Sequence, residues 1–274
     1  EQIQQSWERA DRGLRLALDF VEGNVGIPGS ELLPSHFSLI PLVAVFATRK
    51  DLSSSEERTL RRWFLLVNAF SRYAGQAETR LNQDLATLGA DAAHIDELLA
   101  SLLRALRSEP RLTAQDLERA GSNSPFFPLF FLAVISRDAT DWFKGIKLRR
   151  QSFAEDQLIE YHHVFPKKHL DAAGVDRYTR DEMANLAFLG AKANRRILAK
   201  RPEVYLAEIA DNAPERLEAQ LVPMERELWH LERFSEFLAR RRALRLVFYT
   251  VQDPSRYRRS GGSTNLRAGE NHRR

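Results

Sequence analysis

Seven side chains within one segment of this chain could together hydrolyse a phosphodiester bond. That reaction needs a base that activates water, a divalent cation that stabilises charge on the phosphate, and cationic groups that hold the strand. The segment offers candidates for all three, in chain order His162, His163, Lys167, Lys168, Asn194, Arg195 and Arg196. A pair of histidines alone would be weak support for such a site, whereas the full set predicts one.

The residue types predict how the roles are divided. His163 is the candidate general base, because imidazole accepts a proton near neutral pH. His162 and Asn194 are the candidate ligands of a metal ion, and since the chain contains no cysteine, any metal must be held by His, Asn, Asp or Glu. Four cations are the candidates for binding phosphate: Lys167, Lys168, Arg195 and Arg196.

A short strand must carry the two histidines. The apolar run from Leu158 to Val164 predicts this strand, which Pro166 ends because proline cannot donate to a ladder. Residues 186–189 predict a second strand and residues 192–200 a helix, which together give the order of a ββα unit. Neighbours on a regular strand point to opposite faces, so both histidines can serve one phosphate only if the chain bends at the strand end. Pro166 favours such a bend.

The rest of the chain has helical periodicity. Residues 1–22 predict a helix, because Ile3, Trp7, Leu14, Leu18 and Val21 recur at helical spacing. Helix starts are predicted by capping boxes, which begin at Ser53 or Ser54, at Thr113, and at Thr179 with Glu182. We expect additional helices from about residue 36, over 78–88 and 93–107, and in the apolar run that ends at residue 136. Three more are expected over 204–210, 214–221 and 224–249.

These patterns predict a mainly α protein with two domains and a tail. Residues 1–140 form the helical domain. Residues 141–250 form a ββα-metal unit, with its core at 150–201, together with the closing helices. Residues 251–274 are rich in Gly, Ser, Asn and Arg, so we expect a basic, disordered tail.

Composition and charge favour a nucleic-acid partner. The 274 residues are 43% hydrophobic and 28% charged, which is ordinary for a globular chain. The net charge of +4 is uneven: residues 141–200 hold 12 Lys and Arg against 8 Asp and Glu, and residues 251–274 hold 6 against 2. Such a local excess suits a phosphate backbone, although a solvated surface without a partner would look the same.

The sequence predicts no membrane association. The apolar run 125–136 is shorter than the roughly 20 residues that span a bilayer, and no secretory signal opens the chain. The absence of cysteine fits the reducing cytoplasm, where we expect the protein to act.

The segment around the histidines resembles a known nuclease motif. His162-His163-Val-Phe-Pro, followed by Asn185 and Asn194 nine residues apart, resembles the HNH motif. The resemblance implies that His162 ligates the metal, His163 is the general base, Asn185 braces the loop and Asn194 completes the metal site. It also implies DNA cleavage, as a nick or a double-strand break, that leaves 5′-phosphate and 3′-hydroxyl ends.

The resemblance extends to nearly the whole chain. Residues 61–64, 71–75, 78–85, 194–196, 202–206 and 234–241 resemble GmrSD-type proteins, a group of modification-dependent restriction and phage-defence nucleases. Such proteins usually begin with a ParB-like domain that senses modified DNA and carries an Asp-Gly-Gln-Gln-Arg type motif. This chain contains no such motif, so it resembles the part that cuts without the part that senses.

One departure from the family concerns the metal. Many relatives carry Asp or Glu at the position of His162. An imidazole in place of a carboxylate weakens the preference for Mg²⁺ and favours Mn²⁺, Co²⁺, Ni²⁺ or Zn²⁺. We therefore expect a divalent metal, Mg²⁺ or Mn²⁺, with other transition metals as alternatives.

Two other interpretations of the same residues stay open. The chain could be a DNA-binding or docking module with a degenerate site, or a helical scaffold whose histidines bind metal without a reaction. Taken one by one, His162 and His163 could also be ordinary partly buried histidines, and Asn185 and Asn194 only a turn residue and a helix cap. His169 is near enough to be a ligand but stands beside two lysines, as a surface histidine would.

Overall fold

The computed structural model describes residues 2–27, 32–107, 112–148, 159–190, 197 and 200–251, with backbone alone over 245–251. It is 64% helix, and the described residues include two short strands. The prediction of a mainly α protein is therefore confirmed. The arginine-rich residues 252–274, predicted as a disordered tail, lie outside the described residues.

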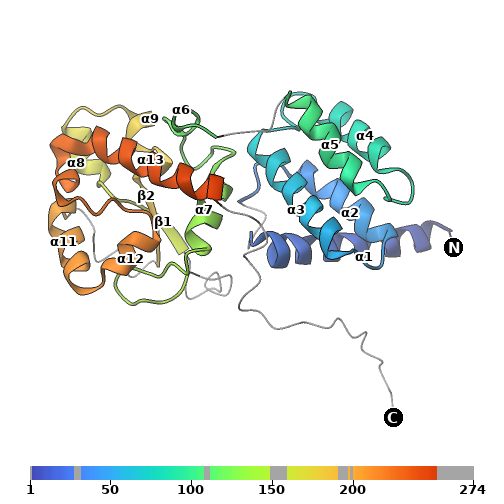
Figure 1. Cartoon of the computed structure of the whole chain (residues 1–274), viewed down its shortest axis with the longest axis horizontal. Helices are drawn as coiled ribbons and strands as arrows, with labels where there is room; N and C mark the ends of the chain where they lie inside the picture. The colour runs from blue at the N-terminus through green and yellow to red at the C-terminus, as the bar shows by residue number, and fades with distance from the viewer. Residues whose placement is uncertain are drawn as a thin grey trace, which may run out of the picture.

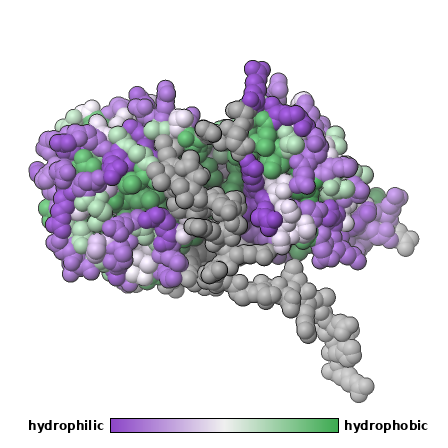
Figure 2. Space-filling model, viewed as in Figure 1, coloured by the Kyte–Doolittle hydropathy of each residue, from purple (hydrophilic) through white to green (hydrophobic). Residues whose placement is uncertain are grey.

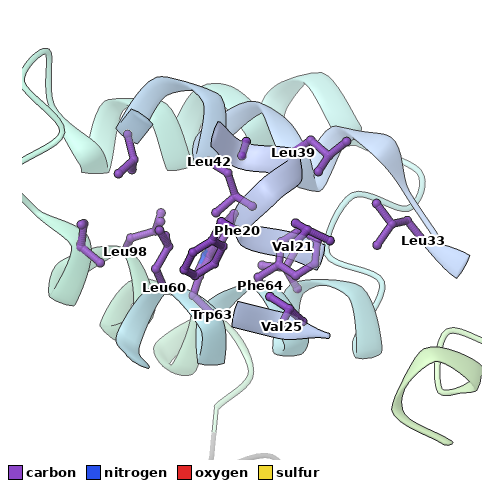
Figure 3. Packing of buried hydrophobic residues seen from close by; sticks show 14 of the residues in the cluster. Phe20, Val21, Val25, Leu33, Leu39, Leu42, Leu60, Trp63, Phe64 and Leu98 are labelled. Atoms are coloured by element: carbon purple, nitrogen blue, oxygen red, sulfur yellow. The ribbon is translucent and has the colours of Figure 1, made fainter. Parts of the chain in front are cut away.

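Five helices in the first part of the chain enclose one apolar core, at the blue end of Figure 1. They are α1 (Gln2–Phe20), α2 (Leu39–Thr48), α3 (Ser54–Ala69), α4 (Ala77–Leu88) and α5 (Ile95–Ala105), with a π-helical turn η1 (Val21–Val25) after α1 and a 3₁₀ turn η3 (His36–Ser38) before α2. Figure 3 shows Phe20, Leu42, Leu60 and Trp63 converging in this core. Trp63 and Phe64 are fully buried, as helical spacing predicts.

Helix α1 forms as predicted but buries a different face. Its inner residues are Gly13, Ala17 and Phe20, whereas Ile3 and Trp7 are 88% and 72% exposed. A Cβ added at Gly13 would lie 2.7 Å from the carbonyl oxygen of Val43, so the absence of a side chain there lets α1 cross close to α2. Of the predicted apolar stripe, only Val21 is buried, whereas Ile3, Trp7, Leu14 and Leu18 are exposed.

Helix starts follow the local capping signals in two of three cases. Ser53 and Glu56 form a capping box at the start of α3, and Thr113 and Asp116 form one at the start of α6 (Ala114–Leu117). The capping box predicted at Thr179 and Glu182 is wrong. Asp176 caps α9 (Arg177–Arg180) instead, because its carboxylate accepts from the backbone N–H groups of Tyr178 and Thr179.

The second part of the chain is built around a two-stranded antiparallel sheet, β1 (Ile159–His163) and β2 (Leu186–Gly190). Helix α7 (Phe127–Ile135) packs on it, with the Phe130 and Phe188 ring centroids 4.9 Å apart. The other elements are α8 (Lys167–Ala172), the 3₁₀ turn η5 (Met183–Asn185), α11 (Pro202–Asn212), α12 (Pro214–Ala219), the 3₁₀ turns η6 (Arg226–Trp229) and η7 (Leu231–Arg233), and α13 (Phe234–Val251). Figure 1 shows these elements gathered around the sheet.

The sequence pattern assigns α7 to the helical domain that ends at residue 140. In the structure, Phe127, Phe130 and Phe131 of this helix share a hydrophobic cluster with Leu186 and Phe188 of β2. The side chains that form the other core come mainly from residues before 107. The apolar side chains of α6 and α7 therefore belong mainly to the cluster around β2, and those of α1 to α5 belong to the first core. The division into two domains stays a prediction.

The closing helix begins later than its pattern indicates. The predicted helix over 224–249 starts at Phe234, and residues before it form the turns η6 and η7, with His230 in an extended conformation between them. The indole N–H of Trp229 donates to the carbonyl oxygen of Pro223 at 2.7 Å, which closes this irregular segment. Leu228 and Trp229 are apolar because they are buried, although they lie in a 3₁₀ turn and not in the predicted helix.

None of the helices that the structure describes is long and apolar enough to cross a membrane. Figure 2 shows mainly hydrophilic side chains on the visible face of the molecule, with smaller apolar patches between them. The apolar run 125–136 is a buried helix, as predicted, because most of its side chains lie in the cluster shared with β2.

Candidate active site

Both histidines of the predicted site lie in the regular ladder of the hairpin. His162 pairs with Ala187 and His163 with Leu186, and the N–H of Val164 still donates to the carbonyl oxygen of Asn185 at 2.7 Å. The chain turns only at Pro166, from which α8 begins at Lys167. The expectation of a bend at the histidine pair is therefore wrong: the ladder continues past both residues, and the two side chains leave opposite faces of β1.

His162 is buried between the hairpin and α11. It is 7% exposed, and its ring meets the ring of Tyr205 in a T-shaped arrangement with centroids 6.5 Å apart. The Tyr205 hydroxyl donates to the carbonyl oxygen of Val164 at 2.5 Å, and burial raises the pKa of this phenol above its usual range. Tyr205 therefore fixes the backbone just beyond the histidine pair.

His163 forms a hydrogen bond with a carboxylate. Its Nε2 lies 3.0 Å from Oδ1 of Asp181, and its side chain is 15% exposed. Burial lowers the pKa of His163 to about 4, and the charge of Lys167 acts in the same direction, while Asp181 opposes the shift. The contact is therefore a hydrogen bond from a neutral imidazole near pH 7 rather than an ion pair.

Asp181 is itself held by Arg180. The guanidinium donates from Nε to Oδ1 at 3.0 Å and from Nη2 to Oδ2 at 2.8 Å, and its Nη1 donates to Asp171 of α8 at 2.7 Å. These hydrogen bonds, followed by the charges of Lys167 and Arg180, hold the pKa of Asp181 well below its usual range. The carboxylate beside His163 is thus ionised and fixed from two sides.

Asn185 joins the two segments that carry His163 and Asp181. It is fully buried, its Oδ1 accepts from the N–H of Phe165 at 2.8 Å, and its Nδ2 donates to the carbonyl oxygens of Phe165 at 3.2 Å and Arg180 at 2.9 Å. One amide therefore ties the backbone two residues after His163 to the backbone one residue before Asp181. The resemblance implies that Asn185 braces the loop, and these three hydrogen bonds would do so.

Two of the four predicted phosphate-binding cations are described. Lys167 and Lys168 open α8 and are exposed, and Nζ of Lys167 lies 3.4 Å from Oδ1 of Asp181. Lys167 therefore lies beside the carboxylate that binds the His163 ring. Arg195 and Arg196 lie outside the described residues, as does Asn194.

The metal prediction depends on a residue that the structure does not describe. Of the two predicted ligands only His162 is described, and the described ranges hold no group of three His, Asp or Glu side chains arranged to bind a metal ion. An imidazole nitrogen and an amide oxygen are suitable donors for a divalent cation. The fit of a metal here therefore turns on where Asn194 lies relative to His162.

Asp181 and Tyr205 are the residues at this site that the sequence patterns did not single out. Asp181 lies in the charged run Arg180-Asp181-Glu182, and such a run has no spacing that would mark one residue as part of a site. Tyr205 follows Pro202 in a helix whose periodicity explains it as a core residue.

No family model, curated protein or solved structure matches this chain.

Proposed function

We propose that this chain is a metal-dependent DNA endonuclease of the HNH type, with a ββα-metal unit built from β1, β2 and the segment 191–200. The observation that carries the proposal is the hydrogen bond between His163 and Asp181. It places a neutral imidazole, held by an ionised carboxylate, at the end of a hairpin whose connecting loop is fixed by a buried asparagine.

His163 acts as the general base in this proposal. The imidazole takes a proton from water, and the resulting nucleophile attacks the phosphorus. The bond from phosphorus to the 3′ oxygen breaks and that oxygen takes a proton from solvent water, so that a 5′-phosphate and a 3′-hydroxyl remain. Exposed Lys167 and Lys168 bind neighbouring phosphates, and Arg195 and Arg196 are proposed for the same task. Asn185 keeps the base in place through the backbone of Phe165.

His162 and Asn194 are proposed to hold a divalent metal ion, Mg²⁺ or Mn²⁺. Such an ion, when bound, supplies positive charge for the phosphate and the leaving oxygen. An imidazole ligand also admits Co²⁺, Ni²⁺ or Zn²⁺.

We further propose that the chain is the cutting part of a GmrSD-type restriction or anti-phage defence protein that acts in the cytoplasm. The support is the resemblance of the HNH motif and of residues 61–64, 71–75, 78–85, 194–196, 202–206 and 234–241. The proposed partner is DNA, and the ParB-like sensor would be supplied from outside this sequence.

A specific observation favours a second candidate function. The two histidines leave opposite faces of β1, which separates the candidate ligand from the candidate base, as a DNA-binding module with a degenerate site would allow. That module would bind DNA through Lys167 and Lys168 without cutting it.

Incubation of supercoiled plasmid with the chain separates these two functions. We expect relaxation of the plasmid with Mn²⁺ or Mg²⁺, none with EDTA, and none with His163→Ala purified in the same way. His169→Gln is the matched control, since it removes a nearby histidine of α8 that has no assigned role. Binding of the plasmid without relaxation under any metal would support the degenerate module, and equal relaxation by His163→Ala would exclude His163 as the base.

A further inference from the structure

We propose that Asp181 is a positioning residue that fixes the His163 ring as its Nε2–H tautomer and so leaves Nδ1 as the proton acceptor. The inference concerns the chemical state of one ring. Its catalytic consequence rests on the proposed nuclease function, whereas the tautomer itself can be measured without any nuclease activity.

The chemistry of the contact decides which nitrogen carries the proton. An ionised carboxylate has lone pairs and no proton, so it can only accept a hydrogen bond. Oδ1 of Asp181 lies 3.0 Å from Nε2 of His163, a distance at which Nε2 must be the donor. A neutral imidazole has one N–H, and therefore Nδ1 is left with a lone pair that can accept a proton. Among the described residues, Asp181 is the hydrogen-bond partner of this ring.

The surroundings keep Asp181 ionised and still. Arg180 binds both carboxylate oxygens, which is the fork geometry that guanidinium and carboxylate groups match best. Lys167 at 3.4 Å and Arg177 at 3.7 Å add two more positive charges. Three nearby cations favour the ionised form of the carboxylate, which can only accept hydrogen bonds.

The positions of both partners are coupled through Asn185. The same amide binds the backbone of Phe165 in the segment after His163 and the backbone of Arg180 in the segment before Asp181. A movement of either segment would break a buried hydrogen bond. The two side chains therefore meet as parts of one fixed loop rather than as two independent surface groups.

The main experiment is nitrogen NMR of the full chain labelled with ¹⁵N-histidine at pH 7.5, with His163→Gln used to assign the ring. We expect the wild-type ring to have a protonated Nε2 and a bare Nδ1. Asp181→Asn should weaken this preference, because an amide can donate as well as accept. A wild-type ring protonated on Nδ1, or an unchanged ring in Asp181→Asn, would overturn the proposal.

Plasmid nicking supplies the catalytic measurement. We expect Asp181→Asn to lower kcat by about 10- to 100-fold, the usual effect of losing a residue that orients a catalytic group, with little change in KM. Asp176→Ala is the matched control, since it removes the carboxylate that caps α9 in the same loop but does not contact His163. Equal loss of kcat in both variants would assign Asp181 a structural role only.

A further variant covers the case in which Asp181→Asn does not fold. Asp181→Glu keeps an acceptor on a longer side chain, so the Nε2–H tautomer should persist while kcat falls through displacement of the ring. Loss of that tautomer in a folded Asp181→Glu would contradict the proposal. A wild-type chain with the expected tautomer but no cleavage would refute the nuclease function and leave the positioning of His163 by Asp181 standing.

Discussion

The guanidinium of Arg241 donates a hydrogen bond of 2.9 Å to the carbonyl oxygen of Ala184, the residue before Asn185. Arg241 is fully buried and also binds the carbonyl oxygens of Gln220 and Leu221 at 2.9 and 3.1 Å. Helix α13 therefore closes over the loop that carries the candidate site. The charge is buried among carbonyl groups that would otherwise have to find other donors.

Replacement of Arg241 tests how much this closure contributes. Arg241→Met would leave three buried carbonyl groups without their donor, so we expect the free energy of unfolding to fall by about 3 kcal/mol or more. Arg240→Met is the control, because the exposed pair of Arg240 with Glu225 is worth about 1 kcal/mol at most. Urea unfolding measures both variants. A loss below about 1 kcal/mol for Arg241→Met would show that the loop closes without it.

Replacement of Asn185 should affect both the fold and the site. Asn185→Ala would leave the N–H and C=O of Phe165 and the C=O of Arg180 without partners, at a cost of about 1–3 kcal/mol for each unsatisfied group. Asn212→Ala is the control, since its exposed amide donates to the carbonyl oxygen of Glu208 within α11. Thermal unfolding and plasmid nicking should both decline in Asn185→Ala. Full stability with normal nicking would contradict the bracing role.

The metal proposal predicts a defect that metal can repair. His162→Ala and Asn194→Ala should raise the Mn²⁺ concentration needed for half-maximal nicking by about 10-fold or more, whereas His163→Ala should stay inactive at every concentration. Titration of nicking against Mn²⁺ distinguishes these outcomes. If His162→Ala followed the same metal curve as the wild-type chain, His162 would not be a ligand.

Lys168 is the simplest test of phosphate binding, because it is exposed and opens α8 beside the histidines. Lys168→Gln should weaken binding to all DNA sequences alike and reduce the slope of log affinity against log salt by about 1. Lys50→Gln, at an exposed lysine after α2, should leave the slope unchanged. Fluorescence anisotropy with two unrelated duplexes measures this. Equal slopes for both variants would remove Lys168 from the DNA interface.

The capping box of α3 predicts a dependence of stability on pH. Hydrogen bonds from the backbone N–H and the side chain of Ser53, together with Arg49, lower the pKa of Glu56 from 4.5 to about 2. The folded state thus prefers the charged form, so its contribution is complete above pH 4.5 and is lost as the pH falls towards 2. Glu56→Gln should lower the thermal midpoint at pH 7, and the difference should shrink at pH 3.

Glu57→Gln is the control for this prediction, because it removes the same charge from the same first turn of α3. Any effect of that charge on the helix dipole is shared by both variants. The pH dependence should therefore be larger for Glu56→Gln. An equal slope in the two variants would assign it to the helix dipole and not to the capping box.

Local signals predicted the starts of α3 and α6, because a capping box depends only on residues three apart, as Ser53 and Glu56 show. The buried face of α1 could not be predicted in this way. It is decided by Gly13, whose missing side chain admits the backbone of α2 at Val43, a residue thirty positions away. The spacing of the apolar residues along α1, taken alone, would place Ile3 and Trp7 inside.

The candidate site shows the same division. His162 and His163 were selected as candidates from residue type and spacing, and Asn185 from the resemblance to the HNH motif. The order strand, loop, strand places all three together through the pairing of β1 with β2. Asp181 was missed, because its role depends on the path of the loop between the strands. That path is fixed by the side chain of Asn185 and by Arg241 from α13, and the second of these contacts lies outside any pattern within residues 159–190.

The bond between Arg241 and Ala184 also sets an order of events during translation. A ribosome releases β1 and its two histidines well before it has made α13, since chains emerge from their N-terminus. Until then the carbonyl oxygen of Ala184 lacks the donor that holds it in the finished fold. A nascent chain therefore carries the histidine pair ahead of the helix that secures the loop between the strands. For a protein proposed to cut DNA, the loop of the candidate site therefore gains this hydrogen bond only after α13 has been translated.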